Sequence, residues 1–120
     1  MEIITHQKID QELCGTPIFS EEGASRVEFF ATERMAADES GLVHGGFIFG
    51  LADYAAMIAV NHPNVVLGAA DVKFLKPVKV HDQVMAEARV VSKKGKKHNV
   101  HVIVQKGDEH VFEGEFTCFV

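Results

Sequence analysis

The longest apolar stretch of the chain covers residues 46–61, which read GFIFGLADYAAMIAVN. Its length and its alanines favour a helix over a strand. Pro63 is expected to end that helix, because the residue before a proline avoids helical geometry. The stretch is too short to cross a membrane, which needs about 20 apolar residues, and it contains Asp53. Because a helix that is apolar nearly all round is usually buried on most sides, we predict a buried central helix.

Strand-like patterns flank this helix on both sides. Before it, residues 26–33 place Val27, Phe29 and Ala31 on one face. After it come four further runs, over residues 65–75, 84–92, 98–105 and 111–119. The last two each show one regular face, with Val100, Val102 and Val104 in the first and Phe112, Gly114, Phe116 and Cys118 in the second.

The connections between these runs read HPN, KPVKVHDQ, KKGKK and KGDE. Short glycine turns favour antiparallel hairpins, so we expect a meander of four strands after the helix. A short helix over residues 3–13, closed by Gly15 and Pro17, is expected at the start. Without linkers or repeats, the pattern predicts a single domain over residues 1–120, of the α+β class, with one long helix packed on one antiparallel sheet.

Composition narrows the functional classes. The chain has 120 residues, 47% hydrophobic and 24% charged, with a formal net charge of −5. Nucleic-acid binding is disfavoured, because a phosphate backbone needs a basic face. The polar N-terminal stretch lacks the apolar region of a secretory signal. Cys14 and Cys118 are therefore expected to be free thiols in a cytoplasmic protein without membrane attachment.

Asp53 is the one charged residue inside the predicted helix. Burying a carboxylate is costly unless it is paired or hydrated, so its presence needs a reason. One interpretation is catalysis, and the alternative is a carboxylate satisfied across a dimer interface. Helical spacing puts Asp53 on a stripe of small and polar positions, completed by Gly46, Gly50, Met57 and Asn61. Such a stripe suggests contact with a ligand or a second subunit rather than simple core packing.

The helix is preceded by His44-Gly45-Gly46. Backbone N–H groups at a helix start lack internal partners, and the helix dipole adds positive potential there. Such a start can bind an anion or polarise a carbonyl, and glycines allow close approach.

HGGFIFGLAD followed by AAMIAVN resembles the helix signature of hotdog-fold thioesterases, especially the phenylacetate-pathway type. VKFLKPVKVHDQVMAEARVVSKKGKK is similar to their next strand, their F-x-x-P turn and the following hairpin. The resemblance covers residues 26–120 and implies a hotdog fold, acyl-CoA substrates, and no metal or cofactor beyond the coenzyme A of the substrate. It also implies a homodimer or homotetramer with active sites between paired subunits.

By the same resemblance, Asp53 is the catalytic carboxylate, and Gly46 or Gly45 supplies the amide that polarises the thioester carbonyl. His44 matches the histidine that opens the motif. Two positions depart from the family. Relatives often have asparagine at the position of Asp38, and some have a serine at the position near Leu67. For the substrate-binding residues, we expect Gly45, Asp38, Asn61, Lys94 and Lys96. The two lysines would contact the phosphates of coenzyme A, and the alternative is that they form a solvated hairpin tip.

Particular residues argue against a metal site, a serine hydrolase and a dehydratase. His98 and His101 lie three apart on a predicted strand and so point to opposite faces, which is poor geometry for one metal ion. No G-x-S-x-G nucleophile motif is present. A non-catalytic acyl-CoA-binding domain is the main alternative, and its expected DNA-binding segment has no counterpart in residues 1–25. A dehydratase ranks last, because His44 precedes the helix instead of lying along it.

Overall fold

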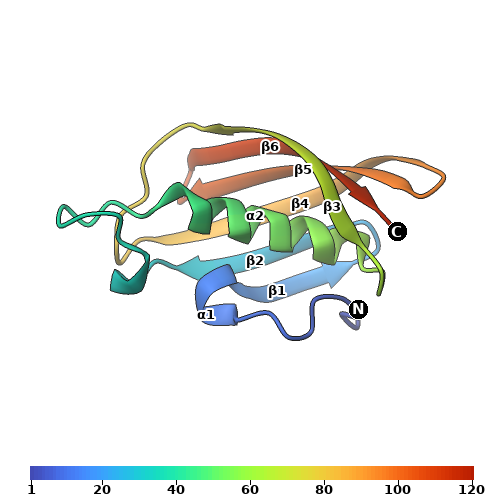
Figure 1. Cartoon of the computed structure of the whole chain (residues 1–120), viewed down its shortest axis with the longest axis horizontal. Helices are drawn as coiled ribbons and strands as arrows, with labels where there is room; N and C mark the ends of the chain where they lie inside the picture. Colours follow the sequence, from blue (N-terminus) through green and yellow to red (C-terminus); the bar gives the residue numbers. More distant parts are fainter.

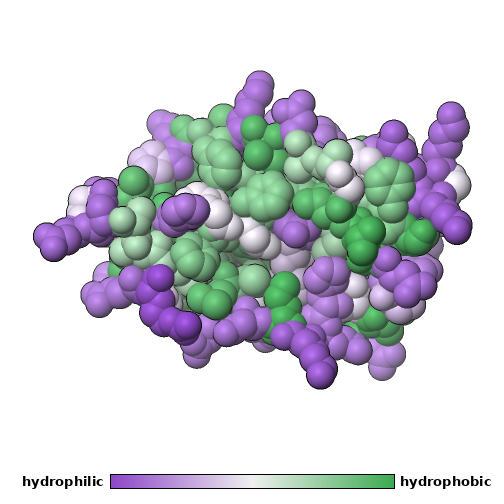
Figure 2. All heavy atoms as spheres, in the orientation of Figure 1, coloured by the Kyte–Doolittle hydropathy of each residue, from purple (hydrophilic) through white to green (hydrophobic).

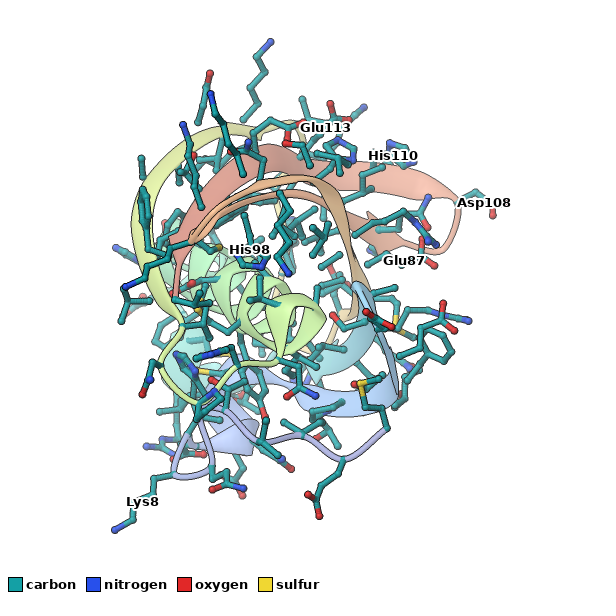
Figure 3. All side chains as sticks on the ribbon, turned by 90° about the vertical axis from the view of Figure 1, so that its right-hand side faces the viewer. Lys8, Glu87, His98, Asp108, His110 and Glu113 are labelled. Atoms are coloured by element: carbon teal, nitrogen blue, oxygen red, sulfur yellow. The ribbon has the colours of Figure 1, made fainter.

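A six-stranded antiparallel sheet curves around one long helix in the computed structural model of the chain, which describes residues 1–120 (Figures 1 and 3). The helices are α1 (Gln11–Cys14), the short 3-10 helix η1 (Glu33–Met35) and α2 (Gly45–Val60). The strands are β1 (Thr16–Glu21), β2 (Ala24–Phe30), β3 (Val66–Phe74), β4 (Gln83–Lys94), β5 (Lys97–Lys106) and β6 (Glu109–Phe119).

The central helix is confirmed. Nine of the sixteen residues of α2 are buried, and they pack on the inner face of the sheet. The helix ends at Asn61, which adopts the left-handed conformation (φ 49°) and donates its backbone N–H to the carbonyl of Met57 (2.8 Å). An αL residue at this position is a common helix end, and here it stops the helix two residues before Pro63.

The inner face of the sheet is made of the residues that the alternation predicted. Val27, Phe29 and Ala31 are buried, as are the three valines of β5 and the inward residues of β6. The hairpins at Gly95 and Gly107 are confirmed, and both glycines have positive φ angles. His98 lies inside the curve of the sheet (Figure 3), whereas His101 points outward between Glu113 and Glu115, so the two histidines do face opposite sides.

The predicted meander of four strands is wrong in one pairing. The strand order is β1-β2-β4-β5-β6-β3, so β3 pairs with β6 and not with β4. Tight turns force β4, β5 and β6 to pair in sequence, and β2 takes the free edge of β4. The remaining place for β3 beside this set is the free edge of β6, and the KPVKVHDQ segment is a crossover instead of a hairpin turn.

The N-terminal region differs from the prediction in two ways. The helix expected over residues 3–13 is limited to α1, capped by Asp10, whose side chain accepts the N–H of Glu12. Residues 1–9 form an irregular segment that is hydrogen bonded to Ser20 on β1 and to Asn61 after the end of α2. A helix as short as α1 has little stability of its own. β1 was missed, because Pro17 is unfavourable inside a sheet; as an edge strand, β1 tolerates it.

The arrangement, one long helix wrapped by a curved antiparallel sheet, is the hotdog fold, as predicted. None of its helices has the length and apolar character needed to span a membrane.

The close pairing of β3 with β6 gives a test of the topology. A Cβ atom on Gly114 of β6 would lie 2.5 Å from Val72 Cγ1 and 3.1 Å from the carbonyl oxygen of Asp71. We expect Gly114→Ala to lower the free energy of unfolding by about 1–3 kcal/mol, measured by urea titration. Gly50→Ala on α2 is the matched control; it has open space and should hold or raise stability. Equal stability of both variants would contradict the β3–β6 contact.

Candidate active site

Asp53 lies midway along α2, half-buried. Its Oδ1 atom is buried and has no hydrogen-bond partner. Desolvation raises the pKa of this carboxyl above its ordinary value, and the nearby His6 acts in the opposite direction. A buried carboxylate oxygen without a partner is rare in folded proteins, and a raised pKa suits a group that takes up a proton near neutral pH.

Two thiols lie near this carboxylate, Cys14 on α1 and Cys118 on β6, and both are free as predicted. Burial raises the pKa of Cys14, and the charges of Asp10 and Asp53 raise it further. Burial, helped by Asp53, raises the pKa of Cys118 to about 12. Both thiols therefore stay protonated at neutral pH, and a protonated thiol is a poor nucleophile.

The start of α2 is capped by His44, whose Nδ1 accepts the backbone N–H of Gly46 (2.8 Å). The predicted donor at Gly46 is therefore occupied by the side chain of the motif histidine. The N–H of Gly45 takes part in no hydrogen bond. Of the two glycine amides, Gly45 is thus the one free to receive a carbonyl oxygen in this conformation.

A cavity of about 280 Å³ opens beside Gly45. Its walls are mainly apolar: Val43, Ile48, Phe74, Leu75, Lys76, Pro77, Val78 and Val111. The ring of Phe74 lies against the glycine, since a Cβ atom there would be 3.2 Å from Phe74 Cε2. Sequence reasoning did not assign these residues, although Phe74 and Pro77 form the F-x-x-P turn that carried part of the family resemblance. The cavity offers an apolar group a place next to the free amide.

Gly45 and Asp53 of one chain lie eight residues apart on the helix, which corresponds to about 12 Å along its axis. A carbonyl donor and the base acting on the same carbonyl must both lie within roughly 3–3.5 Å of the reacting atoms. One chain therefore cannot bring its own Gly45 and its own Asp53 to one thioester.

The other residues of the predicted stripe on α2 lie in two different environments. Gly50, in the first half of the helix, has open space beside it. Met57 is fully buried, and the Asn61 side chain is hydrogen bonded to the backbone of Glu2 and Ile4. The structure thus uses Asn61, a predicted substrate-binding residue, to hold residues 1–9.

The remaining predicted substrate contacts lie away from Gly45 and from Asp53 of the same chain. Asp38 is in an exposed loop, where it accepts hydrogen bonds from the Ser40 N–H (2.9 Å) and hydroxyl (2.6 Å), and these bonds lower its pKa. Lys94 and Lys96 flank the β4–β5 turn, at the end of the molecule opposite the start of α2 (Figure 1).

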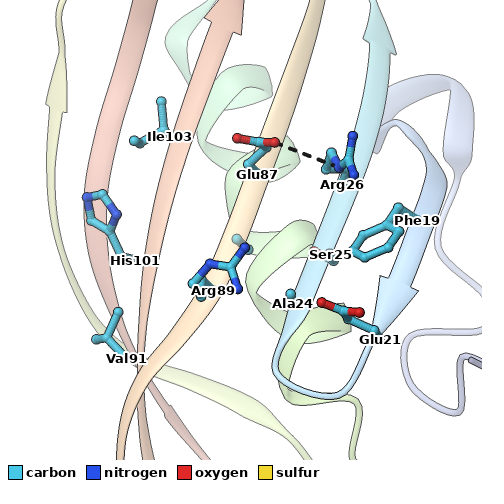
Figure 4. Close-up of a pocket in the computed structure, with 11 residues that line it drawn as sticks. Phe19, Glu21, Ala24, Ser25, Arg26, Glu87, Arg89, Val91, His101 and Ile103 are labelled. Atoms are coloured by element: carbon cyan, nitrogen blue, oxygen red, sulfur yellow. Dashed lines mark ion pairs between the residues drawn. The ribbon is translucent and has the colours of Figure 1, made fainter.

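A second hollow, of about 300 Å³, lies on the outer face of the sheet (Figure 4). Arg26 and Glu87 form an ion pair there (3.7 Å), beside Phe19 and Arg89. Because the sheet separates this hollow from α2, Asp53 and Gly45 do not reach it. The structure contains no group of three or more His, Cys, Asp or Glu side chains arranged to hold a metal ion.

Comparison with known proteins identifies the family. The model of the thioesterase superfamily matches residues 40–113, from the loop before α2 to the middle of β6. The chain belongs to the thioesterase superfamily. The match spans the helix start, Asp53 and the F-x-x-P turn, which confirms the resemblance seen in the sequence.

Three similar proteins differ in their names and in the share of their length that this chain matches. A protein of Aquifex aeolicus named methylthioribose-1-phosphate isomerase is 59% identical over the whole chain, which spans 26% of it. The transcription factor FapR of Caldanaerobacter subterraneus is 32% identical over 88% of the chain, matching 53% of the regulator. The crystal structure of the uncharacterised protein PH1136 from Pyrococcus horikoshii is 52% identical, with a TM-score of 0.99 over 100% of this chain and 92% of that one. The chain thus spans a quarter to a half of the first two relatives.

The raised pKa of Asp53 predicts a pH-dependent effect on the stability of this thioesterase-superfamily chain. Above its folded-state pKa, the ionised and desolvated carboxylate destabilises the fold, and this penalty disappears as the pH falls toward the ordinary value of 3.8. Asp53→Asn should therefore melt at or above the wild-type temperature at neutral pH, and the difference should vanish at about pH 3.5. Melting curves across this pH range measure it. A variant less stable than wild type at neutral pH would show that the carboxylate has a stabilising partner.

Proposed function

We propose that this chain is an acyl-CoA thioesterase that works as a homodimer, with Asp53 as its base or nucleophile. The observation that carries the proposal is the buried Asp53 oxygen without a partner, on a helix whose first amide is also unpaired. Leaving both groups unsatisfied is unfavourable for folding alone. A thioester substrate would satisfy both groups. Its carbonyl oxygen would accept the N–H of the amide, and its carbonyl carbon would be attacked by the carboxylate or by a water molecule that the carboxylate activates.

The chemistry follows from these two groups. As a base, Asp53 would take a proton from water while the water oxygen attacks the thioester carbon. The carbonyl oxygen becomes an oxyanion, which the Gly45 N–H at the positive end of the helix stabilises. The carbon–sulfur bond then breaks, and the coenzyme A thiolate leaves and takes up a proton. As a nucleophile, Asp53 would attack the carbon itself, the carbon–sulfur bond would break to release the coenzyme A thiolate, and water would cleave the resulting anhydride to the free acid and the Asp53 carboxylate.

We propose a second subunit because Gly45 and Asp53 of one chain are too far apart to act on the same thioester. The edge strand β3 is the surface that we propose for pairing, since all of its residues are exposed or half-buried. Val66 and Phe74 at its ends are 58% and 55% exposed. The other edge, β1, contains Pro17 and a register shift, features that discourage strand pairing. Apolar residues gather over the middle of the α2 and β3 face, with polar residues around them (Figure 2).

Antiparallel pairing of two β3 strands would set the two α2 helices side by side in opposite directions. The helix start of the partner would then lie toward the helix end of this chain, where Lys94 and Lys96 are found. In this arrangement, the lysines that lie far from their own Gly45 approach the partner's site. This supports their predicted contact with the coenzyme A phosphates, while Asp38 remains at the surface.

The second candidate is an acyl-CoA-binding domain without catalysis, and the 32% identity to a transcription factor favours it. Hotdog domains serve both purposes, so the fold does not decide between them. The unpaired Asp53 carboxylate favours the enzyme, because a sensor gains nothing from a desolvated base beside its ligand. The isomerase name is not transferred, because the match covers only 26% of that protein.

The main test is hydrolysis of a panel of acyl-CoAs, followed by thiol release, in wild type and Asp53→Asn. We expect kcat to fall by about 10²–10⁴, because the base or nucleophile is lost, while a non-hydrolysable acyl-CoA still binds. Asp108→Asn, in the exposed β5–β6 turn, is the matched control and should keep wild-type turnover. Tight binding without turnover by the wild type would favour the sensor.

Mixing two inactive variants tests whether the site is shared. Gly45→Pro removes the N–H and adds the ring carbons; the backbone should tolerate it, because proline fits the first helical position and the backbone of His44 (ψ 130°) is already extended. Gly45→Ala keeps the N–H and controls for the added carbon. Random exchange of Gly45→Pro and Asp53→Asn subunits should restore about a quarter of wild-type activity, since half the dimers have one intact site of two. No recovery in proven mixed dimers would refute the shared site.

A further inference from the structure

Phe74 at the end of β3 forms one wall of the cavity beside Gly45. It stands opposite Phe112 of β6 in the strand register, and the two rings pack edge to face, with centroids 5.1 Å apart and planes at 78°. Phe112 is fully buried, so it offers the Phe74 ring a rigid support. The ring also lies against Gly45, where a Cβ atom would be 3.2–3.7 Å from three of its carbons. The Phe74 ring is therefore held at the start of α2, next to the unpaired Gly45 amide.

Part of the apolar lining of this cavity is open to solvent. Phe74 is 55% exposed and its neighbour Leu75 is 45% exposed, whereas other lining residues such as Val78 are buried. Large apolar side chains exposed around a hollow are typical of a binding site, because covering them releases water from apolar surface. The Gly45 amide lies at the same place and has no hydrogen-bond partner. A ligand that combines a carbonyl oxygen with an apolar group satisfies both.

The chemistry of the cavity distinguishes among the parts of an acyl-CoA. The side chains that line it are aliphatic apart from Phe74 and Lys76, and the Lys76 ammonium lies 3.8 Å from the Glu109 carboxylate. The amide groups of the pantetheine arm would lose their hydration in such surroundings without gaining partners, which is unfavourable. A carboxylate at the end of an acyl group would have to compete with Glu109 for the one cation. An uncharged hydrocarbon chain is the part that the cavity accommodates without these costs.

We propose that this cavity receives an uncharged aliphatic acyl group and that Phe74 limits the length of that group. The substrate class rests on the thioesterase function proposed above. With the carbonyl oxygen at the Gly45 N–H, the acyl chain would extend along the cavity until it meets the ring that Phe112 supports. The ring occupies space that a longer chain would need, and a packed ring moves only with the loss of its contacts. Phe74 is thus a specificity-determining residue that takes no part in the chemical step.

The experiment measures kcat/KM of wild type and Phe74→Ala for straight-chain acyl-CoAs from butanoyl-CoA to dodecanoyl-CoA. Removal of the ring should move the preferred substrate to a longer chain. Burial of one methylene is worth about a fourfold change, so a chain longer by two carbons should gain about tenfold or more in kcat/KM relative to the chain that the wild type prefers. Phe30→Ala is the matched control, because Phe30 on β2 is 57% exposed and is not part of this cavity. It should keep the wild-type profile.

A second comparison tests the charge of the substrate. Adipoyl-CoA has the same number of acyl carbons as hexanoyl-CoA but ends in a carboxylate. The wild type should hydrolyse adipoyl-CoA with a kcat/KM at least about tenfold lower, because the carboxylate would lose its hydration in the cavity. An equal or higher value for adipoyl-CoA would overturn the assignment of an uncharged acyl group.

An unchanged chain-length profile in folded, dimeric Phe74→Ala would overturn the role of Phe74. If light scattering shows that this variant no longer dimerises, Phe74→Leu takes its place, because leucine keeps an apolar side chain at the end of β3 but lacks the ring. A smaller shift toward longer chains in Phe74→Leu supports the proposal, and the wild-type profile overturns it.

If the wild type hydrolyses no acyl-CoA, the thioesterase function fails, and binding decides whether the cavity receives an acyl group. The probes are acyl-CoA analogues of the same chain lengths in which a methylene replaces the sulfur, and isothermal titration calorimetry measures their affinity. A preference for longer analogues in Phe74→Ala than in wild type supports the role of Phe74. Equal profiles, or no binding, overturn it.

Discussion

The enclosure of α2 is the constraint on which the rest of this structure depends. The curved sheet covers one side of the helix, and α1 and the N-terminal segment cover part of another. In such surroundings, a polar group on the helix must find a partner or lose its hydration without compensation. Asn61 finds one in the backbone of residues 2–4. Asp53 does not, and this single unpaired carboxylate separates the helix from an ordinary core element.

The same enclosure explains why the site is assembled from distant segments. The helix contributes the Gly45 amide and the Asp53 carboxylate, but its rise keeps them about 12 Å apart. The end of β3 brings Phe74 against Gly45 and forms the cavity beside it. A rigid helix cannot bring Gly45 and Asp53 together, which is why the proposed thioesterase mechanism pairs each of them with a group from a second subunit.

Membership of the thioesterase superfamily does not by itself assign an activity. Similar sequences are found in part of a transcription factor and in a quarter of a protein named for an isomerase. One fold can carry different functions, so packing residues are a poor guide to chemistry. The informative positions are those that packing does not explain, which here are Asp53 and the free amide of Gly45.

The sequence by itself determined the elements whose patterns are local. The apolar run specified α2, the alternation of Val100, Val102 and Val104 specified the inner face of β5, and Gly95 and Gly107 specified the tight turns, because periodicity and turn chemistry act between near neighbours. It also singled out Asp53, since a charge within an apolar run is visible without a structure. Only the tertiary structure decided the β3–β6 pairing, the occupation of the Gly46 amide by His44, and the path of residues 1–9. Those features depend on which of several distant segments pairs with a free strand edge or a hydrogen-bonding group. A local sequence pattern contains no information about that choice.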